Sequence, residues 1–100
     1  MDVQQLEFQL PERIEQALSD AGLMYFTYNR GIKVNDSSIT ANIELKGSKH
    51  AFKITLSYDR SAQSAQVKLD ESEGEAPAGN FDKITHAICA LPAELKALLI

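Results

Sequence analysis

The chain has 100 residues, of which 44% are hydrophobic and 24% are charged, which is the length and composition of one globular domain. No apolar run approaches the roughly 18–20 residues that a membrane-spanning helix needs. The N-terminus also lacks the basic and apolar regions of a secretory signal. We therefore expect a single domain over residues 1–100, cytoplasmic, of bacterial or phage type and without membrane contact.

The net charge of −4 is unevenly distributed along the chain. Residues 30–60 carry six basic and three acidic side chains, whereas the two flanking segments together carry four basic and eleven acidic ones. This pattern predicts acidic helices and an acidic loop around a weakly basic sheet.

The N-terminal part of the chain predicts a helix. From Pro11 onward the apolar residues follow helical spacing, with Pro11 expected at the first helical position and Gly22 as the stop. The inward positions are Ile14, Ala17, Leu18 and Ala21. Residues 4–10 alternate between apolar and polar side chains, which fits a short strand or extended arm, although they also fit the first turns of the helix.

The segment 23–28 is rich in aromatic and bulky side chains and predicts a strand. Gly31 follows it closely, either in a three-residue hairpin loop or as a bulge within one longer strand. Residues 35–38 then provide a polar turn, because Asn and Asp side chains bond readily to their own backbone.

Two alternating segments, 39–45 and 52–58, give the clearest sheet signal. They predict an antiparallel hairpin with one apolar and one polar face. A turn at Gly47-Ser48 would set Lys46 opposite Lys49, whereas a turn at Ser48-Lys49 would set Glu44 opposite Lys53. Turn chemistry favours the first register and charge pairing the second.

A third alternating segment, 65–69, predicts another antiparallel strand. Pairing Tyr58 with Ala65 would set Lys53 opposite Asp70, which is electrostatically favourable. Residues 71–80 contain no large apolar side chain and predict a flexible acidic loop.

The C-terminal part predicts one or two helices. Asn80 is expected to be the N-cap of a helix, and Pro92 restarts the chain into a final helical turn. Cys89 lies between apolar residues, so we expect it to be a small buried core residue, and as the single cysteine it cannot form an internal disulfide.

No segment carries a catalytic, metal or phosphate-binding motif. The acidic cluster from Asp70 to Glu75 lacks the spacing of a calcium-binding loop, since Phe81 stands where such a loop needs its final glutamate. His50 and His86 have no nucleophile or metal ligand near them in the sequence, so surface or structural roles are expected. We expect no cofactor and no metal, and a non-catalytic role is favoured over an enzyme.

These elements predict an α+β fold, with an antiparallel sheet of three to five strands. An N-terminal helix and one or two C-terminal helices are expected to pack on one face of that sheet. The opposite face is predicted to be polar.

The favoured function is a non-catalytic module that binds another protein in an adaptor, regulatory or inhibitory role, with homodimerisation left open. The evidence is apolar surface at two places, the 23–28 segment and the C-terminal residues. The expected contact residues are Tyr25, Tyr28, Leu98, Leu99 and Ile100.

Two alternatives come from other functional classes. A small-ligand-binding domain or minor enzyme would use a pocket between helices and sheet, lined by Tyr25, Tyr58 and His86. Nucleic-acid binding would use the basic residues of the central hairpin, but aromatic side chains are missing among them and the net charge is negative. Its candidate residues are Lys46, Lys49, Lys53 and Arg60.

Overall fold

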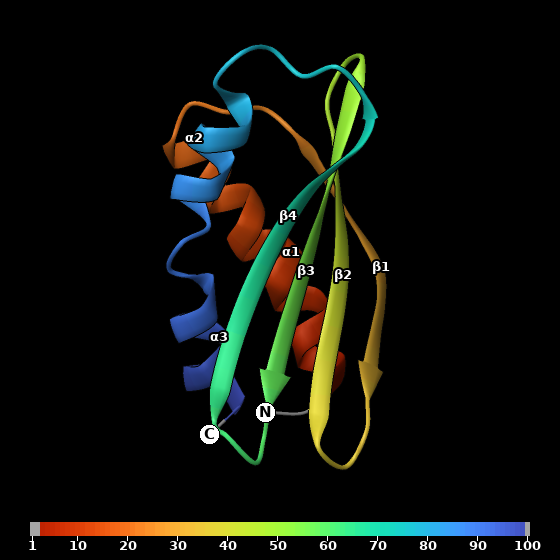
Figure 1. The fold of residues 1–100 in the computed structure, drawn as a ribbon, viewed down its shortest axis with the longest axis vertical. Coiled ribbons are helices and arrows are strands. Elements are labelled where there is room, and N and C mark those ends of the chain that lie inside the picture. Colours follow the sequence, from red (N-terminus) through yellow and green to blue (C-terminus); the bar gives the residue numbers. More distant parts are fainter. Residues whose placement is uncertain (1–2, 100) are drawn as a thin grey trace.

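The computed structural model of the protein describes residues 3–99, apart from the side chains of residues 3, 4, 6, 98 and 99. A helix precedes four consecutive strands, and two short helices follow them (Figure 1). The elements are α1 (Val3–Asp20), β1 (Phe26–Val34), β2 (Ser38–Lys46), β3 (His50–Asp59), β4 (Ser64–Gly74), α2 (Asn80–Ala87) and α3 (Leu91–Leu99).

The strands form one antiparallel sheet in the order β1-β2-β3-β4, and all three helices lie on the same face of it (Figure 1). Helix α1 packs against β1, whereas α3 packs against β3 and β4. This arrangement confirms the predicted α+β fold with helices on one face.

Residues 4–10 belong to helix α1, so the second of the two interpretations of this segment is correct, and it is not a strand or an extended arm. The prediction that Pro11 begins the helix is wrong, since Pro11 lies inside it. Proline has no N–H to donate within the helix, which is unfavourable. Leu10, Ile14 and Leu18 are all almost completely buried at four-residue spacing, and this packing outweighs the missing bond.

Gly22 ends α1, as predicted. It adopts a left-handed φ of 76°, and its N–H donates to the Ser19 carbonyl at 3.0 Å. The N–H of Leu23 donates to the Leu18 carbonyl at 2.8 Å, which completes a Schellman motif. Both leucines belong to the core, so the chain turns back over the sheet at a fixed point.

Strand β1 begins at Phe26, three residues later than predicted, and it is bulged in its middle. Asn29 pairs with Ile43 and Gly31 pairs with Asn42, which leaves Arg30 as the extra residue. Gly31 therefore marks a bulge within one long strand, and not a hairpin loop. The bulge shifts the alternation by one residue, so that Ile32 packs against the core.

The central hairpin adopts the register that charge pairing favours. Glu44 lies opposite Lys53, and the Gly47 N–H donates to the His50 carbonyl at 2.9 Å around a Ser48-Lys49 turn. Asn35 Oδ1 accepts from the N–H groups of Ser37 and Ser38, which confirms the predicted polar turn before β2.

Strand β4 pairs with β3 as the sequence predicts, with Tyr58 opposite Ala65 and Lys53 opposite Asp70. It continues through Gly74, so only residues 75–79 of the predicted 71–80 loop lie between regular elements. The flexibility of that segment stays a prediction.

Two predictions about the C-terminal helices are wrong. The N-cap of α2 is Gly79 and not Asn80, whose side chain is used elsewhere in the fold. Cys89 is exposed and not buried, because it lies between α2 and α3 while its neighbour Ile88 fills the core position.

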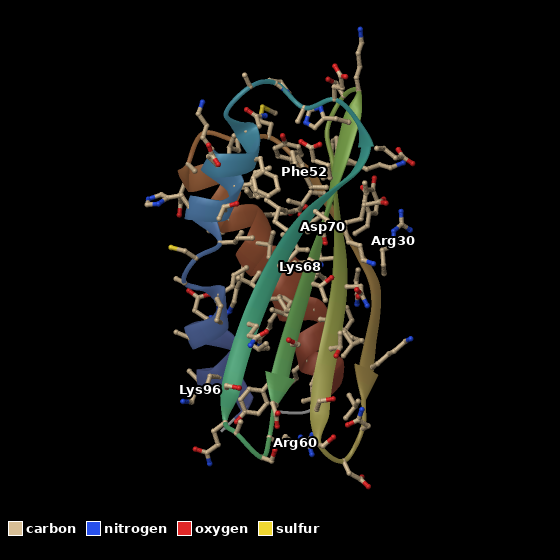
Figure 2. All side chains as sticks on the ribbon, in the orientation of Figure 1. Arg30, Phe52, Arg60, Lys68, Asp70 and Lys96 are labelled. Carbon is tan, nitrogen blue, oxygen red and sulfur yellow. The ribbon has the colours of Figure 1, made fainter. Side chains whose placement is uncertain are left out.

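The core lies between the inner sheet face and the three helices. Phe52 projects from the sheet toward the helix layer (Figure 2). The largest of the side chains with exposure below 2% are Leu10, Ile14, Leu18, Ile43, Leu45, Phe52, Ile54, Leu56, Ile84, Ile88 and Leu95.

Candidate functional site

Large apolar side chains are exposed where the chain enters β1. Met24 is 94% exposed, Phe26 71% and Tyr28 43%, all within five residues. Phe26 lies opposite Lys46 and Tyr28 opposite Glu44, so both rings lie on the outer face of the sheet, away from the helices. We call Met24–Tyr28 the apolar edge segment, and a cluster of exposed apolar side chains of this kind is typical of an interaction surface.

A groove of about 480 Å³ lies beside this segment. One wall comes from the C-terminal half of α1, and the other comes from the turn between β2 and β3, with the apolar edge segment between them. The lining residues are Glu15, Ser19, Leu23, Met24, Tyr25, Phe26, Lys46, Gly47 and Ser48. The groove thus has an apolar floor, with Glu15 on the α1 wall and Lys46 on the opposite wall.

The backbone of β1 is accessible here because β1 is an edge strand (Figure 1). The Thr27 N–H donates to Glu15 Oε1 of α1 at 3.2 Å. A side chain can accept this bond because alternate N–H groups of an edge strand point away from the sheet. Thr27 Oγ1 is buried and has no hydrogen-bond partner among the described residues.

Tyr25 of this segment is held by two side chains from elsewhere in the fold, His50 at the start of β3 and Asn80 at the start of α2. Asn80 Nδ2 donates to Tyr25 Oη at 2.8 Å, and Tyr25 Oη lies 2.7 Å from His50 Nε2. The Tyr25 hydroxyl therefore accepts from Asn80 and shares a second hydrogen bond with the His50 ring. The Tyr25, His50 and Phe52 rings also meet edge to face, at centroid distances of 5.3–6.0 Å.

Gly47 makes room for this cluster. A Cβ atom at Gly47 would lie 2.6 Å from His50 Cε1 and 3.1 Å from Tyr25 Cε1. Such distances are too short for non-bonded atoms, so a larger residue would displace the two rings. The half-buried His50 is therefore a structural residue, as expected for it.

An ion pair fixes the outer end of the segment. Arg30 Nη2 donates to Glu44 Oε1 at 2.5 Å, and Arg30 Cζ lies 5.3 Å from the centroid of the Tyr28 ring. The hydrogen bond between them lowers the pKa of Glu44 and raises the pKa of Arg30. The pair lies on the outer face of the sheet and Arg30 is more than half exposed, so the pair contributes little to stability. Arg30 also contacts the face of the Tyr28 ring.

Of the predicted contact residues, Tyr25 and Tyr28 both lie in the apolar edge segment, but the Tyr25 ring packs inward against His50 and Phe52, whereas the Tyr28 ring lies on the outer face beside Arg30. Ile100 and the side chains of Leu98 and Leu99 lie outside the described residues. Sequence reasoning missed Met24 and Phe26. The sequence did contain a signal for them, because residues 23–28 carry large side chains on both faces of the predicted strand. Helices that pack on one face of the sheet can bury only one of these two sets.

The residues of the predicted ligand pocket do not come together. Tyr25 lies at the Lys46–Ala51 end of the sheet, and Tyr58 is seven residues further along β3, roughly 23 Å away at strand spacing. Tyr58 is 5% exposed and belongs to the core, whereas His86 is exposed on α2.

The predicted nucleic-acid residues are also dispersed. Lys46 and Lys49 lie near the β2–β3 turn, whereas Arg60 lies at the opposite end of the sheet (Figure 2). Lys53 lies between Glu44 and Asp70 on the neighbouring strands. These four cations form no single basic patch.

Among residues 3–99, no three His, Cys, Asp or Glu side chains are grouped so that they could hold a metal ion. None of the described helices combines the length and apolarity needed to cross a membrane. Comparison of the chain with protein-family models, with curated proteins and with solved structures finds no match in any of the three.

Proposed function

We propose that this protein is a non-catalytic protein-binding module whose contact surface is the apolar edge segment and the groove beside it. The observation that carries the proposal is the exposure of Met24 and Phe26, at 94% and 71%, on a segment held in place by the Tyr25–His50–Asn80 cluster. Methionine and aromatic side chains are enriched at protein interfaces. A preformed surface also loses little entropy on binding.

Covering this segment would remove apolar side chains from water without rearranging the core. Fully burying one such side chain contributes about 1.5–3 kcal/mol. Tyr25 packs against the core, but Met24 and Phe26 do not belong to it, so these two side chains are available for a partner.

Photo-crosslinking tests the proposal. Met24→p-benzoylphenylalanine, expressed in the native host, should give adducts with another protein, whereas the same substitution at Val34 should not. Val34 is a matched control, because it is 44% exposed on the same strand but at its far end. Failure to crosslink at position 24, or the same adducts from both positions, would contradict the proposal.

A further inference from the structure

The acidic side of α1 continues the groove beside β1. A second hollow of about 420 Å³ is lined by Glu12, Glu15, Gln16 and Ser19, and it shares Glu15 and Ser19 with the first. Glu12, Glu15 and Ser19 follow helical spacing and lie on one exposed face of α1. The two hollows adjoin at Glu15 and Ser19, and we call them together the channel, which has carboxylates on its α1 side and apolar side chains beside β1.

Lys46 lies on the facing wall of the groove, but among the described residues it forms no ion pair with the carboxylates on the α1 side. Neither Glu12 nor Glu15 takes part in an ion pair among the described residues. Within the described part of the chain, the one hydrogen bond that Glu15 accepts comes from the Thr27 N–H of the edge strand. This bond occupies the place that the carbonyl of an added strand would take. A strand that bonds to Thr27 would release the Glu15 carboxylate for a cation.

Symmetry argues against a second copy of the chain as the occupant. An antiparallel pair of two full-length β1 strands would centre on Arg30, which sets two guanidinium groups close together. It would also place both bulges at the centre of the pairing, and bulges of this kind protect an edge from strand addition. The regular part of the edge, Phe26–Asn29, suits a short segment of a different chain.

We infer that the channel binds an extended segment of another protein, added to the edge of β1, in which cationic side chains alternate with large apolar ones. The cations face Glu12 and Glu15, and the apolar side chains contact Met24 and Phe26. Main-chain bonds to the edge give affinity in this mode and the side chains give specificity. The inference rests on the proposed function and specifies the partner.

Synthetic peptides test it. The probe is a blocked peptide in which valine and phenylalanine alternate with lysine, and the matched peptide carries glutamate in place of lysine. The lysine peptide should bind with saturation below about 1 mM, and the glutamate peptide should bind at least about tenfold more weakly. Backbone N-methylation of the lysine peptide should abolish binding, and the Thr27 amide signal should shift in NMR spectra when the unmodified peptide is added.

Variants of the protein locate the contact. Glu12→Gln with Glu15→Gln should weaken binding of the lysine peptide about fivefold, because two partly exposed charge pairs are lost. Glu71→Gln with Glu73→Gln changes the net charge equally on the opposite edge strand, and it should change binding less than about twofold.

Three results would overturn the inference: the lysine peptide does not bind, it binds no better than the glutamate peptide, or the two double variants change its binding equally. If position 24 still crosslinks to another protein in the host, the proposed function survives that result. Adducts of twice the mass of this chain would overturn the inference in favour of a second copy.

Discussion

The β2–β3 hairpin and strand β1 have opposite relations to the core, although both belong to one sheet. In the hairpin, the inward side chains of Ile43 and Ile54 are completely buried. In β1 no residue is completely buried, and Phe26 points to the outer face with 71% of its surface exposed. Strands β2 and β3 each have a neighbouring strand on both sides and helices on their inner face, whereas β1 has a neighbouring strand on one side only. Buried side chains such as Ile43 and Ile54 stabilise the fold, whereas the exposed side chain of Phe26 does not contribute to the core.

The largest expected effect is a stability difference between the two regions. Ile54→Ala should lower the free energy of unfolding by about 2–5 kcal/mol, because it leaves a cavity in the core. Phe26→Ala should lower it by less than about 0.5 kcal/mol, as is usual for an exposed side chain. Urea unfolding followed by circular dichroism measures both values. Similar values for the two variants would show that β1 contributes to the core as the hairpin does.

The cluster that holds the apolar edge segment should have an intermediate effect. Tyr25→Phe removes the hydroxyl that bonds to both Asn80 and His50, and should cost about 1–2 kcal/mol of unfolding free energy. Tyr28→Phe is the matched control, since the Tyr28 ring keeps its contact with Arg30, and it should cost almost nothing. Equal costs in urea unfolding would mean that the Tyr25 hydroxyl does not fix the segment.

The unpartnered hydroxyl of Thr27 gives a stabilising prediction. Thr27→Val removes a buried polar atom that has no partner among the described residues, and should raise the free energy of unfolding by about 1 kcal/mol. Thr55→Val should not stabilise the protein, because Thr55 Oγ1 donates to Asn42 Oδ1. A loss of stability in the Thr27 variant, measured by thermal unfolding, would contradict this account of the edge.

The smallest effect concerns the pH dependence of the outer face. The pKa of Glu44 lies below its ordinary value of about 4.3, so its pairing with Arg30 stabilises the fold above that value and is lost as the pH falls through the lowered pKa. Arg30→Gln should raise the pKa of Glu44 toward the ordinary value, as followed by NMR titration of the side-chain carboxyl.

Asp59 provides the control for this titration. The Ser61 hydroxyl, with the N–H groups of Ala62 and Ser61, lowers the pKa of Asp59 at the other end of the sheet. That pKa should not change in the Arg30→Gln variant and should rise in Ser61→Ala. An unchanged Glu44 pKa in Arg30→Gln would show that the ion pair does not form in solution.

The pairing of β3 with β4 could be predicted from the sequence to the level of individual residue pairs, with Tyr58 opposite Ala65. For β2 and β3, alternating apolar side chains allow only registers that keep both sets on one face. Two registers remained, because turn chemistry favoured one and the pairing of Glu44 with Lys53 favoured the other, and the structure shows the second. Local pattern therefore limits the register of a strand with one wet and one buried face, but it does not choose between the registers that remain.

Elsewhere, tertiary packing overrides the local pattern. Pro11 is a frequent first helical residue, but the buried Leu10 extends α1 through it. Asn80 is a good N-cap residue, but its amide bonds to Tyr25, which is 55 residues away in sequence. The candidate site was only half predicted for the same reason. Which face of the 23–28 segment is covered depends on where β1 lies in the sheet.

The central claim is that the exposed Met24 and Phe26 side chains of the apolar edge segment serve binding and not folding. Met24→Ser combined with Phe26→Ser tests this most directly when stability and binding are measured on the same variant. We expect the urea midpoint to shift little and affinity for the lysine peptide to fall at least about tenfold, while Val34→Ser leaves both unchanged. Unfolding of the double variant, or binding equal to that of the unaltered protein, would contradict the account.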